Sequence, residues 1–205
     1  AALGVQPDGR MKVPADFRGK KVGTPQLGNT QDGACRAWLA GHGFKVTQLG
    51  GDVTVLPTAN PDQLNLFREG KVDAVWTVEP WITRLENEAG AKVFLERNDS
   101  ITTVFVSSAK FLRENRALAK KFAQAHAELT DWILTNPEEA QKLVRDELSA
   151  ETTRQIPAAL VAKAWKRLTF STEISRPPLE QFVRDAQSAG FMRGSPDLKR
   201  LIEIP

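Results

Sequence analysis

The chain has 205 residues, of which 41% are hydrophobic and 26% are charged, and its formal net charge is +3. Such a composition is typical of a soluble globular protein, and the length allows one large domain or two small ones. Lysine and arginine alternate with acidic residues along the chain, whereas a nucleic-acid interface needs a surface of one sign. The composition therefore argues against disorder, a membrane-spanning segment and a nucleic-acid partner.

The first hundred residues alternate between short apolar runs and short amphipathic segments. An apolar run at 1–6 and a helical turn near Pro14 precede this alternation. The alternation is typical of βαβ units and predicts an α/β fold with a mainly parallel sheet. The predicted strands are 21–23, 52–56, 72–76 and 92–95, and the predicted helices are 30–41, 60–70 and 81–89.

From residue 109 onward the sequence predicts helices almost throughout. Charged residues alternate with apolar ones at helical spacing, and we expect the apolar stripe of 109–148 to face the core rather than a membrane or a partner. The run 101–107, rich in Thr and Val, predicts one longer strand before these helices. The predicted helices are 111–135, 137–148, 157–168 and 178–189, and the boundary between the two parts falls at 100–103.

A glycine-containing loop, Thr24–Gln31, follows the strand 21–23 and opens a helix. Asn29 or Thr30 suits the helix N-cap. The free N–H groups of the first turn, together with the helix dipole, favour an anion. Asp32 disfavours an anion unless its side chain turns toward the cap. The pattern alone leaves two interpretations open, an anion site and an ordinary strand-to-helix turn.

Two tryptophans, Trp76 and Trp81, flank a glutamate at the carboxyl end of the predicted strand 72–76. In open α/β sheets this edge faces the ligand crevice. Glu79 could accept a hydrogen bond from an ammonium group or orient a water molecule there, and the tryptophans could enclose an apolar part of a ligand. The alternative is a pair of core tryptophans beside a solvated glutamate.

Candidates for catalysis and metal binding are few. The chain contains two histidines, His42 and His126, and one cysteine, Cys35, and the histidines have no partners at metal-ligand spacing. Cys35 lies in a predicted helix, where a buried, unreactive thiol is expected rather than a nucleophile. No catalytic or phosphate-loop motif occurs. We therefore expect neither an enzyme, nor a metal site, nor a cofactor.

Three segments in order, Gly19–Asp32, Asn60–Leu64 and Gly70–Trp81, resemble the substrate-binding proteins of nitrate, sulfonate and taurine importers. This is the NMT1/THI5-like or SsuA-type family of ABC transporter components, and its aliphatic-sulfonate binders are the most similar branch. The resemblance implies a type II periplasmic-binding-protein fold, in which two α/β lobes joined by a hinge enclose the ligand.

The resemblance also implies a division of the chain. Residues 20–100 would form the second, ligand-closing α/β lobe, and residues 1–19 with 101–205 would form the remaining part of the first lobe with its C-terminal helices. Family members usually begin with a strand–helix–strand–helix portion of the first lobe, which has no counterpart here. The chain is therefore expected to be N-terminally truncated, with an incomplete first lobe.

By the same resemblance the chain would bind a small oxyanion, such as an aliphatic sulfonate, and deliver it to an ABC permease in the inner membrane. It would act as a monomer that is exported to the periplasm or the cell surface. An enzyme on the same fold, desulfinase-like or active in thiamine-pyrimidine synthesis, is the alternative. The ligand-binding residues implied are Thr24, Gln26, Leu27, Gly28, Asn29, Thr30 and Gln31 on the loop, with Thr77, Glu79 and Trp81 on the opposing side.

Overall fold

One sheet organises the first half of the chain in the computed structural model, which describes residues 1–47, 50–98 and 100–202. Its strands are β1 (Ala2–Val5), β2 (Lys21–Thr24), β5 (Thr54–Pro57), β6 (Ala74–Thr77) and β7 (Lys92–Glu96). Within the described residues their order is β5-β2-β6-β1-β7, and β3 (Val46–Thr47) pairs separately with β4 (Gly50–Gly51). β2 is parallel to β5 and β6, whereas β1 is antiparallel to β6 and β7, so β1 alone in this sheet runs in the opposite direction.

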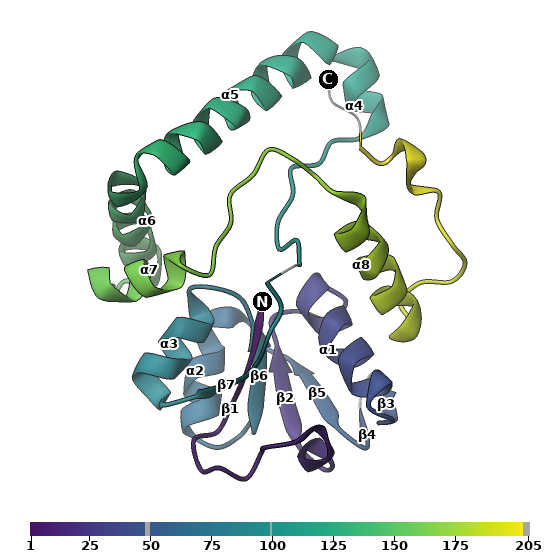
Figure 1. The fold of residues 1–205 in the computed structure, drawn as a ribbon, viewed down its shortest axis with the longest axis vertical. Helices are drawn as coiled ribbons and strands as arrows, with labels where there is room; N and C mark the ends of the chain where they lie inside the picture. The colour runs from purple at the N-terminus through teal and green to yellow at the C-terminus, as the bar shows by residue number, and fades with distance from the viewer. Residues whose placement is uncertain (48–49, 99, 203–205) are drawn as a thin grey trace.

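Helices cover both faces of this sheet (Figure 1). α1 (Thr30–Gly41) lies on one face, and α2 (Asn60–Arg68) with α3 (Trp81–Ala89) lies on the other. Side chains of a strand point alternately to the two faces, so neighbouring residues of β6 join different apolar clusters. Trp76 packs on the α1 side, whereas Val75 packs on the side of α2 and α3. The predicted α/β fold with a mainly parallel sheet is confirmed.

The N-terminal strand corrects one part of the expected division. The resemblance assigns residues 1–19 to a different lobe from 20–100, but β1 lies between β6 and β7, where Leu3 pairs with both Trp76 and Leu95. An apolar run with a strand on each side gains backbone hydrogen bonds along both edges and burial on both faces. That gain explains why β1 joins this sheet. The rest of the two-lobe division stays a prediction.

The second half of the chain consists of helices joined by irregular segments. The helices are α4 (Ala109–Glu114), α5 (Arg116–Thr135), α6 (Pro137–Thr152), α7 (Ala158–Trp165) and α8 (Arg176–Ser188), and short 3-10 turns lie at Pro14–Phe17 and Leu198–Arg200. Figure 1 shows that α5 lies apart from the sheet, whereas α7 returns to α3 and α8 returns to α1. The single helix predicted at 111–135 is wrong in one respect. The backbone of Asn115 leaves the helical region (φ −132°, ψ 38°) and separates α4 from α5.

The strand predicted at 101–107 is also wrong. This segment lies outside the strands of the described chain, and Val106 keeps 75% of its surface exposed. A β-branched, apolar run forms a strand only where a neighbouring strand supplies backbone hydrogen bonds, and no described strand pairs with it. Phe105 instead stacks on Phe122 of α5, with the two ring centroids 4.6 Å apart.

The apolar stripe that was expected to face the core is exposed. Leu118, Phe122 and Leu129 of α5 each keep more than half of their surface accessible. All residues of α5 are described, and of these Ala119 and Thr130 are buried. Helical periodicity predicts which side of a helix is apolar, but only neighbouring elements can cover that side.

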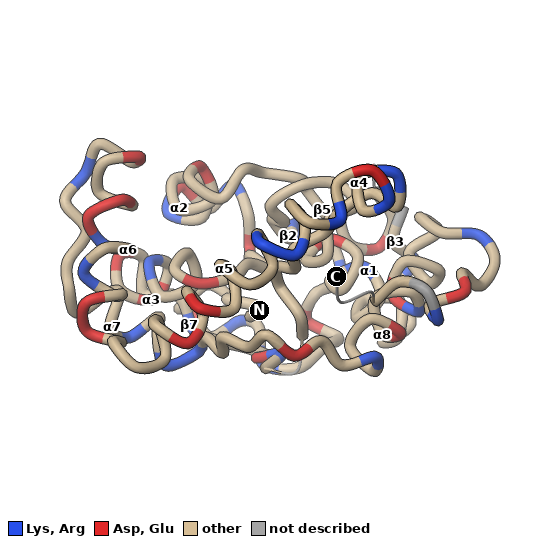
Figure 2. The backbone as a smooth tube through the Cα atoms, turned by 90° about the horizontal axis from the view of Figure 1, so that it is seen from above, with Lys and Arg blue, Asp and Glu red and all other residues tan. Residues whose placement is uncertain are grey.

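The surface carries mixed charge. Figure 2 shows lysine and arginine interspersed with aspartate and glutamate in both halves of the chain, and surface ion pairs such as Arg18–Asp52 join opposite signs. This distribution agrees with the solvated, mixed-charge surface predicted from the sequence. None of the described helices is both long enough and apolar enough to cross a membrane.

Candidate functional site

The carboxyl ends of β2, β6 and β7 meet at one edge of the sheet, and the N-terminus of α1 lies at the same edge (Figure 1). Strands that run in one direction place the loops that follow them side by side, which is why ligands of open α/β sheets bind at this edge. β1 enters at the same edge because it runs antiparallel to β6. Segments far apart in the sequence are thereby brought together.

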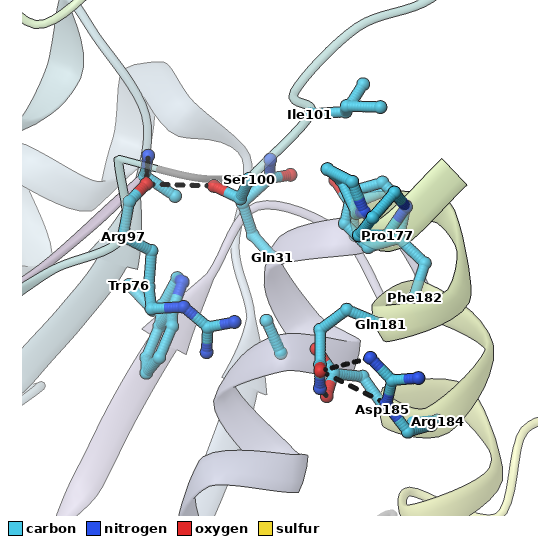
Figure 3. Close-up of a pocket in the computed structure, with 14 residues that line it drawn as sticks. Gln31, Trp76, Arg97, Ser100, Ile101, Pro177, Gln181, Phe182, Arg184 and Asp185 are labelled. Carbon is cyan, nitrogen blue, oxygen red and sulfur yellow. Dashed lines mark hydrogen bonds between the residues drawn. The ribbon is translucent and has the colours of Figure 1, made fainter. Parts of the chain in front are cut away.

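A cavity of about 220 Å³ opens at this edge, between α1, the chain that follows β7, and α8 (Figure 3). It is smaller than the roughly 300–1,000 Å³ of drug-sized sites, so it suits a small solute. The lining residues are Ala1, Thr30, Gln31 and Ala34, Trp76, Arg97, Ser100 and Ile101, and Pro177, Pro178, Gln181, Phe182, Arg184 and Asp185.

One side of the cavity presents hydrogen-bond donors and positive charge. Trp76 is fully buried, and its Nε1 has no hydrogen-bond partner among the described residues. Figure 3 shows the Arg97 side chain beside the Trp76 indole, and Gln31 in the first turn of α1 borders the same space. A buried donor without a partner costs about 1–3 kcal/mol, and a helix N-terminus favours negative charge. This side therefore suits an acceptor, above all an anionic one.

The opposite side is formed by α8 and is mixed in character. Pro177 and Phe182 are apolar, whereas the buried Asp185 accepts a hydrogen bond from Gln181 at 2.7 Å. Arg184 donates to the side-chain oxygen of Gln181 at 2.9 Å, so this amide is held at both ends. The apolar part of the wall can contact the less polar portion of a small solute.

The loop 24–31 is held from inside by Asp32, whose side chain is fully buried. Its carboxylate accepts hydrogen bonds from the Thr24 hydroxyl at 2.8 Å and from the Gly28 N–H at 3.0 Å. Arg36, one helical turn further along, pairs with it at 2.9 Å. Asp32 therefore engages donors of the loop itself and gives the loop one defined shape.

Asn29 caps α1, because its side-chain oxygen accepts a hydrogen bond from the Asp32 N–H at 2.9 Å. The sequence allowed either Asn29 or Thr30 in this role, and the structure selects the first. Thr30 and Gln31 then stand in the first turn, where they line the cavity. The two interpretations of the loop are therefore compatible, since a well-capped turn also borders a cavity.

The ten residues expected to bind a ligand are not all brought to the cavity. Thr30 and Gln31 line it. The other eight lie outside its lining. Internal hydrogen bonds engage the side chains of Thr24, Asn29 and Thr77, whereas Gln26, Leu27 and Gly28 are exposed. Glu79 and Trp81 lie beyond the end of β6. A ligand-binding role for these eight residues stays a prediction.

The side chain of Glu79 is withdrawn from solvent and paired. Its side chain is 4% exposed, and its carboxylate accepts hydrogen bonds from Thr83 Oγ1 and Arg167 Nη1, each at 3.0 Å. The interpretation as a solvated glutamate is therefore wrong. Trp81 is partly buried at the start of α3, and the Arg84 guanidinium lies 5.7 Å from the centre of its ring.

Sequence reasoning missed most of the cavity. Arg97 directly follows the carboxyl end of β7, just as the predicted site segment 77–81 lies at the carboxyl end of β6. Its position at a strand end could therefore have identified Arg97 as a candidate from the sequence. Gln181, Phe182 and Asp185 carry no recognisable motif. They reach the site because α8 returns to pack on α1, which no local pattern in the sequence predicts.

The described lining of the cavity includes neither a cysteine nor a histidine. Cys35 is 1% exposed, and burial raises the pKa of its thiol, which disfavours the reactive thiolate. In the part of the chain that the structure describes, no group of three or more histidine, cysteine, aspartate or glutamate side chains is placed to hold a metal ion.

Comparison with known proteins identifies a family and several proteins of the same fold. The sequence matches the NMT1-like family over residues 9–146, and no curated protein matches it. The alkanesulfonate-binding protein SsuA from Xanthomonas axonopodis pv. citri, solved with bound MOPS, matches with a TM-score of 0.74 at 16% identity, over 94% of this chain and 65% of that one. The periplasmic nitrate-binding protein NrtA from Synechocystis PCC 6803 matches with a TM-score of 0.73 at 17% identity, over 98% and 60%. This chain thus spans less than two thirds of either protein.

An enzyme shares the fold as well. The desulfurization enzyme DSZB matches with a TM-score of 0.55 at 17% identity, over 91% of this chain and 67% of that one. Identities at this level establish a common fold for the enzyme and the transport proteins alike. The fold is therefore compatible with both solute binding and catalysis, and the residues of the site decide between them.

Proposed function

We propose that this chain, which belongs to the NMT1-like family, captures a solute for an ABC importer and catalyses no reaction. The observation that carries the proposal is the cavity at the carboxyl edge of the sheet. On one side it has the N-terminus of α1 and the Trp76 Nε1, which has no partner among the described residues. The fold shared with sulfonate-binding and nitrate-binding proteins supports the same function.

The ligand in this proposal is a small oxyanion, such as an aliphatic sulfonate. Its oxygens would accept hydrogen bonds from Trp76 Nε1 and from backbone N–H groups near Gln31, with the charge of Arg97 close by. Charge-assisted hydrogen bonds of this kind are stronger than neutral ones. A short apolar tail would contact Ile101 and Phe182. The other eight residues of the predicted site lie on the same lobe as Trp76, so closure about a hinge would bring the α8 side of the cavity toward the ligand rather than these residues.

The proposed setting is the periplasm or the cell surface. A single copy of the protein would hand its ligand to a permease in the inner membrane. The ligand-closing lobe of the proposal is 20–100, with β1 added to its sheet. The helices that follow residue 101 would belong to the other lobe.

Ligand-dependent stabilisation tests the proposal. The unfolding temperature is measured with ethanesulfonate, taurine, nitrate and bicarbonate, each over a range of concentrations. A ligand that binds only the native state stabilises it by about 2.7 kcal/mol at 100 times its Kd. We expect a sulfonate to give the largest rise. If none of the four changes the unfolding temperature, oxyanion binding is rejected.

Two tryptophan variants locate the binding site. Trp76→Phe keeps an aromatic ring but removes the N–H that borders the cavity, and should weaken sulfonate binding by roughly tenfold. Trp165→Phe is the matched control, because Trp165 packs in a separate apolar cluster on α7. Unchanged affinity in Trp76→Phe would move the site away from this cavity.

An enzyme on the same fold is the second candidate, favoured by the match to the desulfurization enzyme. A desulfinase-like reaction would need a cysteine nucleophile, and Cys35 is buried in the core of the α1 side. We expect a thiol reagent to modify Cys35 only as the protein unfolds. Rapid, complete labelling of the native protein that a ligand blocks would favour the enzyme.

A further inference from the structure

Arg167 lies shortly after α7 and contacts carboxylates from three parts of the α/β half. Its Nη1 donates to Glu79 Oε1 at 3.0 Å and to Glu86 Oε2 at 2.7 Å. Its Nε lies 3.0 Å from Glu96 Oε1. Glu79 belongs to the segment between β6 and α3, Glu86 belongs to α3, and Glu96 ends β7. One guanidinium therefore joins the segment after α7 to three sites around the sheet.

The contact between Arg167 and Glu79 is largely withdrawn from solvent. The Glu79 side chain is 4% exposed and that of Arg167 is 22% exposed. Loss of one member of such a pair is strongly unfavourable, because the other charge is left without compensation. A planar guanidinium also holds several acceptors at fixed angles, which the ammonium group of lysine cannot do. The position of Glu79 therefore depends on Arg167.

The protonation of this cluster reflects the same contacts. Burial alone would raise the pKa of Glu86, but hydrogen bonds from Arg167 and Lys163 outweigh it, and the pKa is lowered. The hydrogen bond to Glu86 in turn raises the pKa of Arg167. Glu86 and Arg167 are therefore ionised together at neutral pH, and their attraction persists across the ordinary working range.

The helices α6 and α7 pack on each other, and α7 also packs on α3. Their apolar cluster consists of Leu148, Ile156, Leu160, Val161 and Trp165. Among the described residues, Arg167 and Lys163 make the hydrogen bonds and ion pairs that join α7 and the segment after it to α3. The Lys163 Nζ lies 3.1 Å from Glu86 Oε2 and 3.2 Å from Asn87 Oδ1. Charged groups thus provide the specific attachment of this helix pair to the sheet half.

We infer that Arg167 is a positioning residue that couples the segment 77–81 to the orientation of α6 and α7. A movement of these helices relative to the sheet would displace Glu79 through Arg167. Glu79 also holds the first turn of α3 through Thr83, so the displacement would pass along the whole segment. The inference rests on the proposed function, since 77–81 is the segment expected to face the ligand.

Two readouts in the ligand-free protein test this coupling. Spin labels on Asn65→Cys in α2 and Lys142→Cys in α6, both exposed positions, report the distance between the sheet half and α6. Fluorine NMR of fluorinated tryptophan reports the surroundings of Trp81, whose resonance is identified by its loss in Trp81→Phe. Cys35 is buried and is expected to remain unlabelled.

Arg167→Met should broaden the distribution of label distances by about twofold and should also split or broaden the Trp81 resonance. Arg167→Lys keeps the charge but loses the guanidinium fork, and should restore both readouts only in part. Arg145→Met is the matched control. It removes an arginine of α6 that pairs with the adjacent Asp146, and it should change neither readout.

Wild-type behaviour of Arg167→Met in both readouts would overturn the inference. So would a change in the label distances with an unaltered Trp81 resonance, because the two parts would then move independently. If Arg167→Met does not unfold cooperatively, Glu79→Leu removes the acceptor of the same contact and is judged by the same readouts. Both measurements omit the ligand, so failure of sulfonate binding would reject the proposed function and leave the coupling standing.

Discussion

Asp32 accepts a hydrogen bond from the Thr24 hydroxyl at 2.8 Å, and both side chains are fully buried. The same carboxylate holds the Gly28 N–H and pairs with Arg36. A negative charge supplied by the protein therefore occupies donors of the loop 24–31. The proposed anion would therefore meet the first turn of α1, where Thr30 and Gln31 line the cavity.

Asp32→Asn should destabilise the protein by about 3 kcal/mol, because the buried Arg36 loses the charge that it pairs with. Urea unfolding measures the change. Asp131→Asn is the control, since Asp131 is an exposed residue of α5 and its replacement should stay within about 0.5 kcal/mol. Equal unfolding midpoints for the two variants would contradict the role given to Asp32.

Stability should depend on pH through Glu86. Hydrogen bonds from Arg167 and Lys163 outweigh burial and lower its pKa below the ordinary 4.5. A carboxylate with a lowered folded-state pKa contributes stability that is complete above the unfolded value and is lost as the pH falls through the folded one. Wild type should therefore lose more stability than Glu86→Gln when urea unfolding is compared above and below pH 4.5. Parallel losses would argue against this ion pair.

Two glycines should respond to alanine in opposite directions. A Cβ on Gly4, in the inner strand β1, would lie 2.8 Å from Ile82 Cδ1, and the crowding should cost about 1–3 kcal/mol. A Cβ on Gly33 in α1 would meet no atom within 4 Å, and Gly33→Ala should stabilise the helix by about 0.5–1 kcal/mol. Calorimetry of both variants checks the signs. A harmless Gly4→Ala would question the packing of β1 against α3.

The exposed face of α5 should tolerate polar substitution. Phe122 is 54% exposed, whereas Phe67 is 1% exposed in the core beside α2. We expect Phe122→Ser to change stability by less than about 1 kcal/mol and to reduce binding of a hydrophobic fluorescent dye. Phe67→Ala should cost about 3–5 kcal/mol. A large loss in Phe122→Ser would show that this face is covered in solution.

Several features of the site were predictable and others were not, and particular residues show why. Asn29 was one of two residues proposed for the cap of α1, because capping depends on a hydrogen bond three residues away. Thr30 and Gln31 follow directly from that cap and reach the cavity. Glu79 was placed at the correct strand end, but its partner Arg167 is 88 residues away in the chain, beyond any local pattern.

The sequence by itself determined the α/β alternation of the first half, the helical second half, the start of α1 to within one cap residue and the family resemblance. These features depend on propensity, periodicity and capping, which act between residues a few positions apart. Only the tertiary structure decided that β1 enters the sheet, that 101–107 stays unpaired, that the apolar face of α5 is exposed and that α8 closes the cavity. The physical reason is that burial and pairing require a partner, and the partner is chosen by which distant segments meet.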